Sequence, residues 1–190
     1  LVEAQARLFV QDMLNRTRRV FPDIKALNGK LFRIYRDTRF SKDKTPYKTH
    51  IGMLFGEATG KACAGPVFYV HIEPGRLWLV TGVKRMDGEA LRNYRNAVAD
   101  NKKGRQIAGV LDALRQEGIA IRSEQYKCAP KGYDPNHQRV DLLRNKSLYA
   151  ERDSSLPRII HTAEFTDHCL HCFSQTKPLY DWLKRARVFS

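Results

Sequence analysis

The chain has 190 residues, of which 34 are Lys or Arg and 20 are Asp or Glu, so its formal net charge is +14. A hydrophobic fraction of 42% spread along the whole chain excludes global disorder. No apolar run reaches the length of a bilayer span, so we expect no membrane partner. The charge favours a polyanionic partner, either nucleic acid or a phosphate-bearing small molecule, and it leaves the oligomeric state open.

The first third of the sequence predicts a helix followed by two strands. Apolar residues at helical spacing run through residues 1–21, and Pro22 closes that helix. Strands are predicted at 30–36 and 49–55, with a loop between them in which Pro46 disfavours pairing. Because Leu1 already lies inside the predicted helix, we expect further residues to precede it.

The middle of the chain gives the clearest strand signal. Two aromatic and β-branched runs over 66–82 flank the turn dipeptide Pro74-Gly75, which predicts a hairpin. Helices are predicted over 88–100 and 104–117, the second ending at Gly118. Residues 119–124 read as a short strand, and residues 128–137 as a loop rich in turn residues.

The last third predicts a helix over 136–145, a strand over 147–152 and a helical end. That end reads as a helix over 162–174 and a restart at Pro178 that runs through residue 187. Helices at both ends and in one central block, with hairpins between them, are typical of an α+β fold with a largely antiparallel sheet. We therefore predict one domain over 1–190, with a central sheet flanked by N-terminal, middle and C-terminal helices.

The most cationic stretch is "RIYRDTRFSKDKTPYKTH", residues 33–50, where six cations and one histidine accompany two acids. Arginine binds phosphate through two parallel hydrogen bonds, lysine adds a point charge, and hydroxyls add further hydrogen bonds. If Phe32 and Ile34 face the core, Arg36 lies on the core side and needs an acid or an anion. The predicted anion-binding residues in this stretch are Arg33, Arg36, Arg39, Ser41, Lys42, Lys44, Tyr47 and Lys48.

Two other interpretations of this stretch stay open. Arg36, Arg39, Asp37 and Asp43 can pair with one another and fasten the loop to the sheet. A solvated run of charges is the second, although Phe40, Pro46 and Tyr47 indicate packing.

A second block of suggestive residues spans 131–146. On the predicted helix His137 and Asp141 are i,i+4 neighbours, and such a pair can orient an imidazole for acid–base work. A surface pair or a cap is the simpler interpretation. We expect this helix to fold against the basic loop, so that Arg144 and His137 join Arg36, Arg39, Lys42, Lys48 and His50 in one cationic pocket.

The segment "DHCLHCF" places Cys169 and Cys172 beside His168 and His171. Zinc sites use such spacing but need a second compact ligand pair, whereas Cys63 and Cys128 are isolated. We predict buried reduced thiols, no metal site, no cofactor and a cytoplasmic location.

Three segments resemble one known family. "FRIYRDTRFSKDKTPYKTHIG", "APKGYDPNHQRVDLLRNKSLYAER" and "KPLYDWLKRA" are similar to the signature of Domain of Unknown Function 2461, a family of uncharacterised proteins. The resemblance covers nearly the whole chain and implies a single α+β domain, without implying a reaction, ligand or partner. Members open with a helical region rich in Asn and Trp, which is absent before Leu1, so an N-terminal part is expected to be missing.

Three functions follow from these residues. The first is an anion-binding domain for a phosphate-bearing ligand or nucleic acid, acting through residues 33–50. The second is an enzyme of phosphoryl or phosphodiester chemistry, with His50, His137 or Asp141 as catalytic candidates. The third is a structural or protein-interaction module in which the basic stretch is an ion-pair network. Whether the protein is an enzyme stays open.

Overall fold

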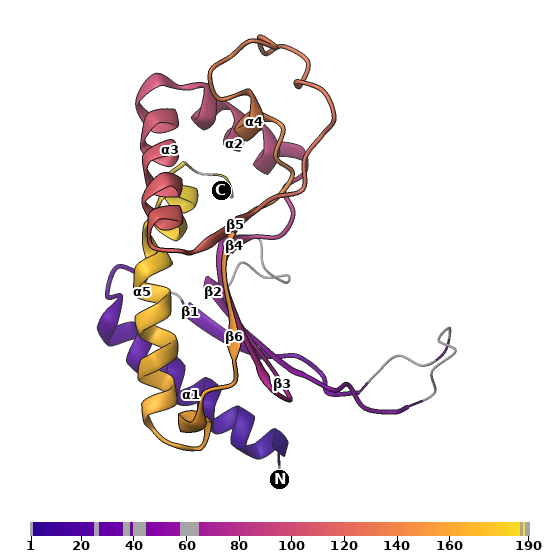
Figure 1. The fold of residues 1–190 in the computed structure, drawn as a ribbon, viewed down its shortest axis with the longest axis vertical. Coiled ribbons are helices and arrows are strands. Elements are labelled where there is room, and N and C mark those ends of the chain that lie inside the picture. The colour runs from indigo at the N-terminus through magenta and orange to yellow at the C-terminus, as the bar shows by residue number, and fades with distance from the viewer. Residues whose placement is uncertain are drawn as a thin grey trace.

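The computed structural model describes residues 2–24, 27–35, 39, 45–57, 65–186 and 188, and it has the predicted α+β fold (Figure 1). In chain order the elements are α1 (Val2–Val20), β1 (Leu27–Leu31), β2 (Ile51–Glu57), β3 (Val67–Glu73), β4 (Arg76–Val83), α2 (Gly88–Ala99), α3 (Asn101–Gln116), β5 (Ala120–Arg122), α4 (Val140–Leu143), β6 (Leu148–Ser155), a 3-10 turn (Arg158–His161) and α5 (Glu164–Arg185).

The described strands form one six-stranded sheet in the order β1-β2-β3-β4-β6-β5, with every neighbouring pair antiparallel. The turn between β3 and β4 contains Gly75, whose φ of 79° a glycine adopts without strain. Alternate residues of each strand point to opposite faces. The sheet therefore has one apolar face and one mixed face.

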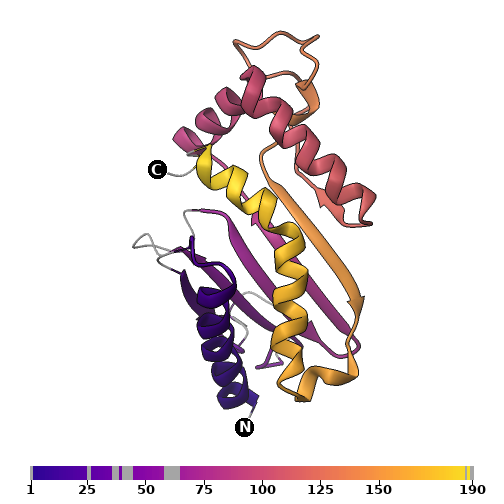
Figure 2. The ribbon, with the colours of Figure 1, turned by 90° about the vertical axis from the view of Figure 1, so that its left-hand side faces the viewer.

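Helices α1 and α5 lie side by side on the apolar face (Figure 2). Phe68 of β3 is 1% exposed and stacks on Tyr180 of α5, with ring centroids 4.7 Å apart. On β1, a Cβ at Gly29 would lie 2.6 Å from a methyl group of Val10, so the glycine permits the close approach of α1. Burial of these rings and methyl groups is the main force that holds this layer together.

A second core lies where α2, α3 and the end of α5 meet the sheet. Tyr94, Ile107 and Leu143 are fully buried there. The hydroxyl of Tyr94 donates to the carbonyl of Leu142 at 3.0 Å, and the indole of Trp182 donates to the carbonyl of Lys103 at 2.9 Å. The polar atoms that enter this core are thus hydrogen-bonded, as burial requires.

Arg139 is the only arginine among the buried polar residues of the described chain, with 7% of its surface exposed. Its Nε donates to the carbonyl of Val98 at 2.8 Å, and its Nη2 to the carbonyl of Ala99 at 3.2 Å. These are orphan carbonyls at the end of α2, where a cation is favoured. Gly104 makes room for it, since a Cβ there would lie 2.4 Å from Nε of Arg139.

The C-terminal helix was predicted wrongly as two helices with a break before Pro178. Instead, α5 runs unbroken from Glu164 to Arg185 with Pro178 inside it. A proline there removes one hydrogen bond and crowds the preceding turn. Buried residues lie on both sides of it, including Phe173 and Leu183, and their packing outweighs that local cost.

Two other predicted elements are shorter than expected. The strand predicted at 30–36 ends at Leu31, although the amide of Phe32 still donates to the carbonyl of Gly52 at 2.9 Å. The helix predicted at 136–145 is the single turn α4, because residues 130–139 form turns that include Gly132 at a φ of 90°. Phe32 and Ile34 are only half-buried, and Arg36 lies outside the described residues.

Candidate functional site

The two described ends of the basic stretch lie side by side. Tyr35 and Tyr47 form an isolated antiparallel bridge, and the amide of Lys48 donates to the carbonyl of Ile34 at 2.7 Å. Both tyrosines project into solvent, with 58% and 56% of their surface exposed, and their ring centroids are 5.3 Å apart. Two large exposed rings in contact are unusual for a surface that only meets water.

An open pocket of about 600 Å³ lies beside this tyrosine pair. Its polar lining includes Tyr47 and Lys48, Glu73 at the end of β3, and Glu3 of α1. Apolar side chains also contribute to the lining, among them Ile34, Ile72 and Leu156. The pocket thus combines apolar surface with a few polar groups, which is the usual composition of a small-ligand site.

His50 lines the same pocket and stacks on His71 of β3, with ring centroids 4.5 Å apart. Partial burial lowers the pKa of His50, and the neighbouring His71 and Lys48 lower it further. The lowered pKa favours the neutral imidazole, which has a nitrogen lone pair that can accept a proton or a hydrogen bond.

His71 is held from both sides on the mixed face of the sheet. Its Nδ1 lies 3.3 Å from the hydroxyl of Tyr69, and its Nε2 lies 3.6 Å from a carboxylate oxygen of Glu73. Nε2 is buried and has no hydrogen-bond partner within the described chain. Gly52 on β2 gives the Tyr69 hydroxyl its place, because a Cβ there would lie 2.5 Å away.

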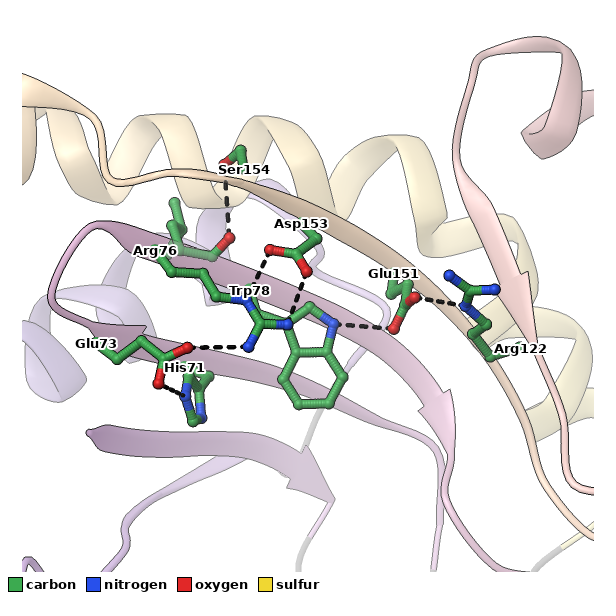
Figure 3. Close-up of polar contacts among 9 residues, drawn as sticks. His71, Glu73, Arg76, Trp78, Arg122, Glu151, Asp153 and Ser154 are labelled. Carbon is green, nitrogen blue, oxygen red and sulfur yellow. Dashed lines mark hydrogen bonds and ion pairs between the residues drawn. The ribbon is translucent and has the colours of Figure 1, made fainter. Parts of the chain in front are cut away.

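A ladder of charged and aromatic side chains continues from Glu73 across the mixed face (Figure 3). Arg76 donates to Glu73 at 2.9 Å and to Asp153 at 2.8 and 2.7 Å. These bonds lower the pKa of both carboxyls and raise that of the guanidinium. Trp78 lies beneath, with the Cζ of Arg76 5.8 Å from its ring.

The far end of the ladder repeats this pairing. The indole of Trp78 donates to Glu151 at 2.9 Å, and Arg122 donates to the other oxygen of Glu151 at 2.6 Å (Figure 3). Each acid of the ladder therefore has a cationic partner. Three carboxylates share two guanidiniums, so the ladder is formally acidic and we do not expect it to attract an anion.

His50 and His168 give the fold a pH dependence. Burial is the largest cause of the lowered pKa in each. The unfolded chain then takes up protons first as the pH falls through about 6.5, so stability is lost between about pH 7 and pH 5. We expect the double variant His50→Gln/His168→Gln to lose less of its melting temperature across that window than the wild type. The exposed His161→Gln is the control, and equal slopes for all three proteins would contradict this.

The predicted site residues divide into three groups. Tyr47, Lys48 and His50 lie together around the pocket, and Arg33 and Arg39 are exposed residues of the same stretch. Arg36, Ser41, Lys42 and Lys44 lie outside the described residues. The residues of the second block, 131–146, lie in and around α4, away from this pocket.

The predicted convergence of the two blocks on one pocket is wrong. The basic stretch joins the sheet where Ile51 faces Ile72, whereas Arg144 leads into Leu148, which faces Val83 at the opposite end. Figure 1 shows the same separation between α4 and the opposite end of the sheet, where β2 begins and β3 ends. Arg144 and the tyrosine pair are therefore separated by the length of the sheet.

His137 and Asp141 do not form the predicted helical pair either. His137 precedes α4, and its Nδ1 accepts a hydrogen bond from the amide of Arg139 at 3.0 Å. Asp141 is 80% exposed and lies 3.5 Å from Nη1 of Arg144. His137 lies outside the helix, so it is not one helical turn from Asp141, and each side chain makes its own local contact.

The cysteine prediction is confirmed for two residues. Cys169 and Cys172 are free, buried in α5, and burial raises the pKa of both thiols. Cys63 lies outside the described residues. In the described ranges no three His, Cys, Asp or Glu side chains gather where they could hold a metal ion, and no helix is both long and apolar enough to cross a bilayer.

The sequence interpretation missed the mixed face. Tyr69, His71 and Glu73 alternate along β3, and Arg76 and Trp78 alternate along β4. Two-residue periodicity across the predicted hairpin already places all five side chains on one face. This periodicity is the sequence signal for the mixed face, beyond the hairpin that the turn dipeptide predicts.

Residues 2–182 match the family model described as a conserved hypothetical protein, DUF2461. The chain belongs to this family. The match spans α1 through most of α5, so it takes in the pocket, the mixed face and the second block together. Neither a curated protein nor a solved structure matches the chain.

Proposed function

We propose that this DUF2461 protein binds a phosphate-bearing ligand with an aromatic base, as in a nucleotide or a nucleic acid strand, at the pocket beside Tyr35 and Tyr47. The observation that carries the proposal is the pair of exposed tyrosine rings, 5.3 Å apart, on the stems of the most cationic stretch. An exposed aromatic ring stabilises a stacked base by about 1–3 kcal/mol.

Charge at the same place supports the phosphate half of the proposal. Arg33 and Arg39 are exposed, Lys48 lines the pocket, and the whole chain carries a net charge of +14. A phosphate placed at the pocket would contact Lys48 directly, and the positive field of the stretch and of the whole chain would offset the carboxylates of Glu3 and Glu73 that also line it. His50, being neutral, can accept a hydrogen bond from a base or a sugar hydroxyl.

Fluorescence anisotropy with labelled single-stranded RNA, single-stranded DNA and a labelled nucleotide tests the proposal. We expect Tyr47→Ala to weaken binding by about tenfold, and Tyr47→Phe to retain it because the ring supplies the stacking surface. The backbone bridge to Tyr35 does not depend on the ring, so the fold should survive.

Two variants with the same change in net charge distinguish binding at this pocket from general attraction of a polyanion to a basic protein. Lys48→Glu and Lys102→Glu change the net charge equally, but Lys102 lies on α3 and outside this pocket. We expect only Lys48→Glu to reduce affinity strongly. Equal losses, or no binding by the wild type at near-physiological salt, would reject the pocket and leave the basic stretch a structural ion-pair network or protein-interaction module.

A second candidate function is phosphoryl or phosphodiester chemistry in the same pocket. The observation that favours it is His50, a neutral imidazole on the pocket wall backed by a second imidazole at 4.5 Å. Such a group can act as a general base near neutral pH. Turnover of a bound oligonucleotide that His50→Gln abolishes without loss of binding would support it; binding without turnover leaves only the binding function.

A further inference from the structure

A second cationic cluster lies at the other end of the sheet, around Tyr126. Lys146 places its Nζ 4.7 Å from the centre of the Tyr126 ring, and Arg95 of α2 places its Cζ 5.2 Å from the same centre. Arg144 donates from Nε to the carbonyl of Tyr126 at 2.7 Å. We call these four residues the Tyr126 cluster.

The backbone around the Tyr126 cluster is fixed by hydrogen bonds. The amide of Tyr126 donates to the carbonyl of Arg144 at 2.8 Å, and the amide of Lys146 donates to the carbonyl of Glu124 at 2.7 Å. The buried Asn145 lies between them and accepts from the side chain of Gln125 at 2.9 Å. These bonds fix the backbone that carries Arg144 and Lys146 beside Tyr126, and Arg95 is joined to the same region by its bond to the carbonyl of Leu143.

Negative charge in the cluster is scarce. Asp141 is 80% exposed and approaches Arg144 only at 3.5 Å. Within the described parts of the chain, neither Arg95 nor Lys146 forms an ion pair with a carboxylate. All three cations are half-buried, so their mutual repulsion is screened less than it would be in open solvent.

We propose that the Tyr126 cluster is a second ligand site and binds a phosphate oxyanion. Three cations from two segments, Arg95 on α2 and Arg144 and Lys146 after α4, suit a tetrahedral anion of charge near −2 better than a planar carboxylate of charge −1. Arg95 gives Nε to the carbonyl of Leu143, so its two terminal nitrogens can face the ligand. Arg144 gives Nε to the carbonyl of Tyr126 and Nη1 to Asp141, which leaves its Nη2 for the ligand. The site stands independently of the tyrosine-pair pocket.

Calorimetric titration with inorganic phosphate, at constant ionic strength set by sodium chloride, tests the site directly. We expect Lys146→Gln and Arg144→Gln each to weaken phosphate binding by about tenfold, the effect of one charge-assisted hydrogen bond. Lys131→Gln, an exposed lysine in the adjoining loop, should stay within about twofold. Lys146→Gln is the decisive variant, because within the described residues its Nζ lies over the ring of Tyr126 and makes no hydrogen bond or ion pair that the substitution would break.

Two further titrations identify the source of the phosphate. A nucleoside monophosphate supplies a terminal monoester, and an oligonucleotide without terminal phosphates supplies diesters only. Preference for phosphate and the monophosphate assigns the site to small ligands, whereas preference for the oligonucleotide assigns it to a nucleic acid backbone. The proposal is overturned if the wild type binds none of the three below a Kd on the order of 10 mM, or if Lys146→Gln binds as tightly as the wild type.

Discussion

Replacing Arg139 by methionine is expected to lower the free energy of unfolding by about 3 kcal/mol, because several buried carbonyls would lose a charged donor at once. Arg139 is 7% exposed, and its guanidinium donates to the carbonyls of Val98, Ala99 and Asp100. Methionine matches much of the volume but donates no hydrogen bond. The end of α2 would then carry unsatisfied carbonyls inside the protein.

Urea unfolding of the variant, followed by circular dichroism, measures this effect. Arg92→Met is the matched control, since Arg92 is an exposed arginine of the same helix and should change stability by no more than about 0.5 kcal/mol. Arg139→Lys should recover only part of the loss, because a lysine offers one donor point instead of a planar fork. An unfolding midpoint for Arg139→Met equal to that of Arg92→Met would show that water replaces the guanidinium.

Arg139 shows where local sequence reasoning stops. It lies in the block that resembles the family signature, between His137 and Asp141, yet nothing in that block says that its partners are residues 98–100. Charge and periodicity describe neighbours along the chain. A contact across some 40 residues depends on how α2 meets the turns before α4, which only the packed structure supplies.

The fold class and the hairpin of β3 and β4 were predictable because their signals are local. Alternating apolar residues and the turn at Pro74-Gly75 specify two paired strands, and the structure pairs Glu73 with Arg76 across that turn. Helices α2 and α3 were likewise close to prediction. The errors fell on α4 and Pro178, where turn geometry and tertiary packing override propensity.

The candidate site was predictable only in part. Tyr47, Lys48 and His50 do line one pocket, because they are close neighbours in the chain just before β2. The contact of His50 with His71 depends on the pairing of β2 with β3, which local sequence does not specify. The distance to Arg144 also depends on strand order, because β6, which follows Arg144, lies between β4 and β5. Because both blocks are cationic, we predicted that they form one pocket. The antiparallel register instead places the two blocks at opposite ends of the sheet.

Gly82→Ala is expected to destabilise the protein by at least about 3 kcal/mol, because the substitution combines backbone strain with a collision. Gly82 has a φ of 141°, a conformation that residues with a side chain rarely adopt. A Cβ there would lie 2.3 Å from the carbonyl oxygen of Leu148 and 2.6 Å from Cα of Tyr149. Both are backbone atoms of β6, so relief requires β4 and β6 to separate.

Gly109→Ala is the counterpart that makes the Gly82 experiment decisive. Gly109 is an exposed position inside α3, and a Cβ there meets no atom within 4 Å. Alanine should therefore stabilise the helix by about 0.5–1 kcal/mol, the opposite sign from Gly82→Ala. Thermal unfolding of both variants measures the difference. If the melting temperature of Gly82→Ala is within a degree or two of the wild type, strands β4 and β6 tolerate a side chain at this point. The hydrogen bond from Trp78 to Glu151, farther along the same strands, would then form without a glycine at position 82.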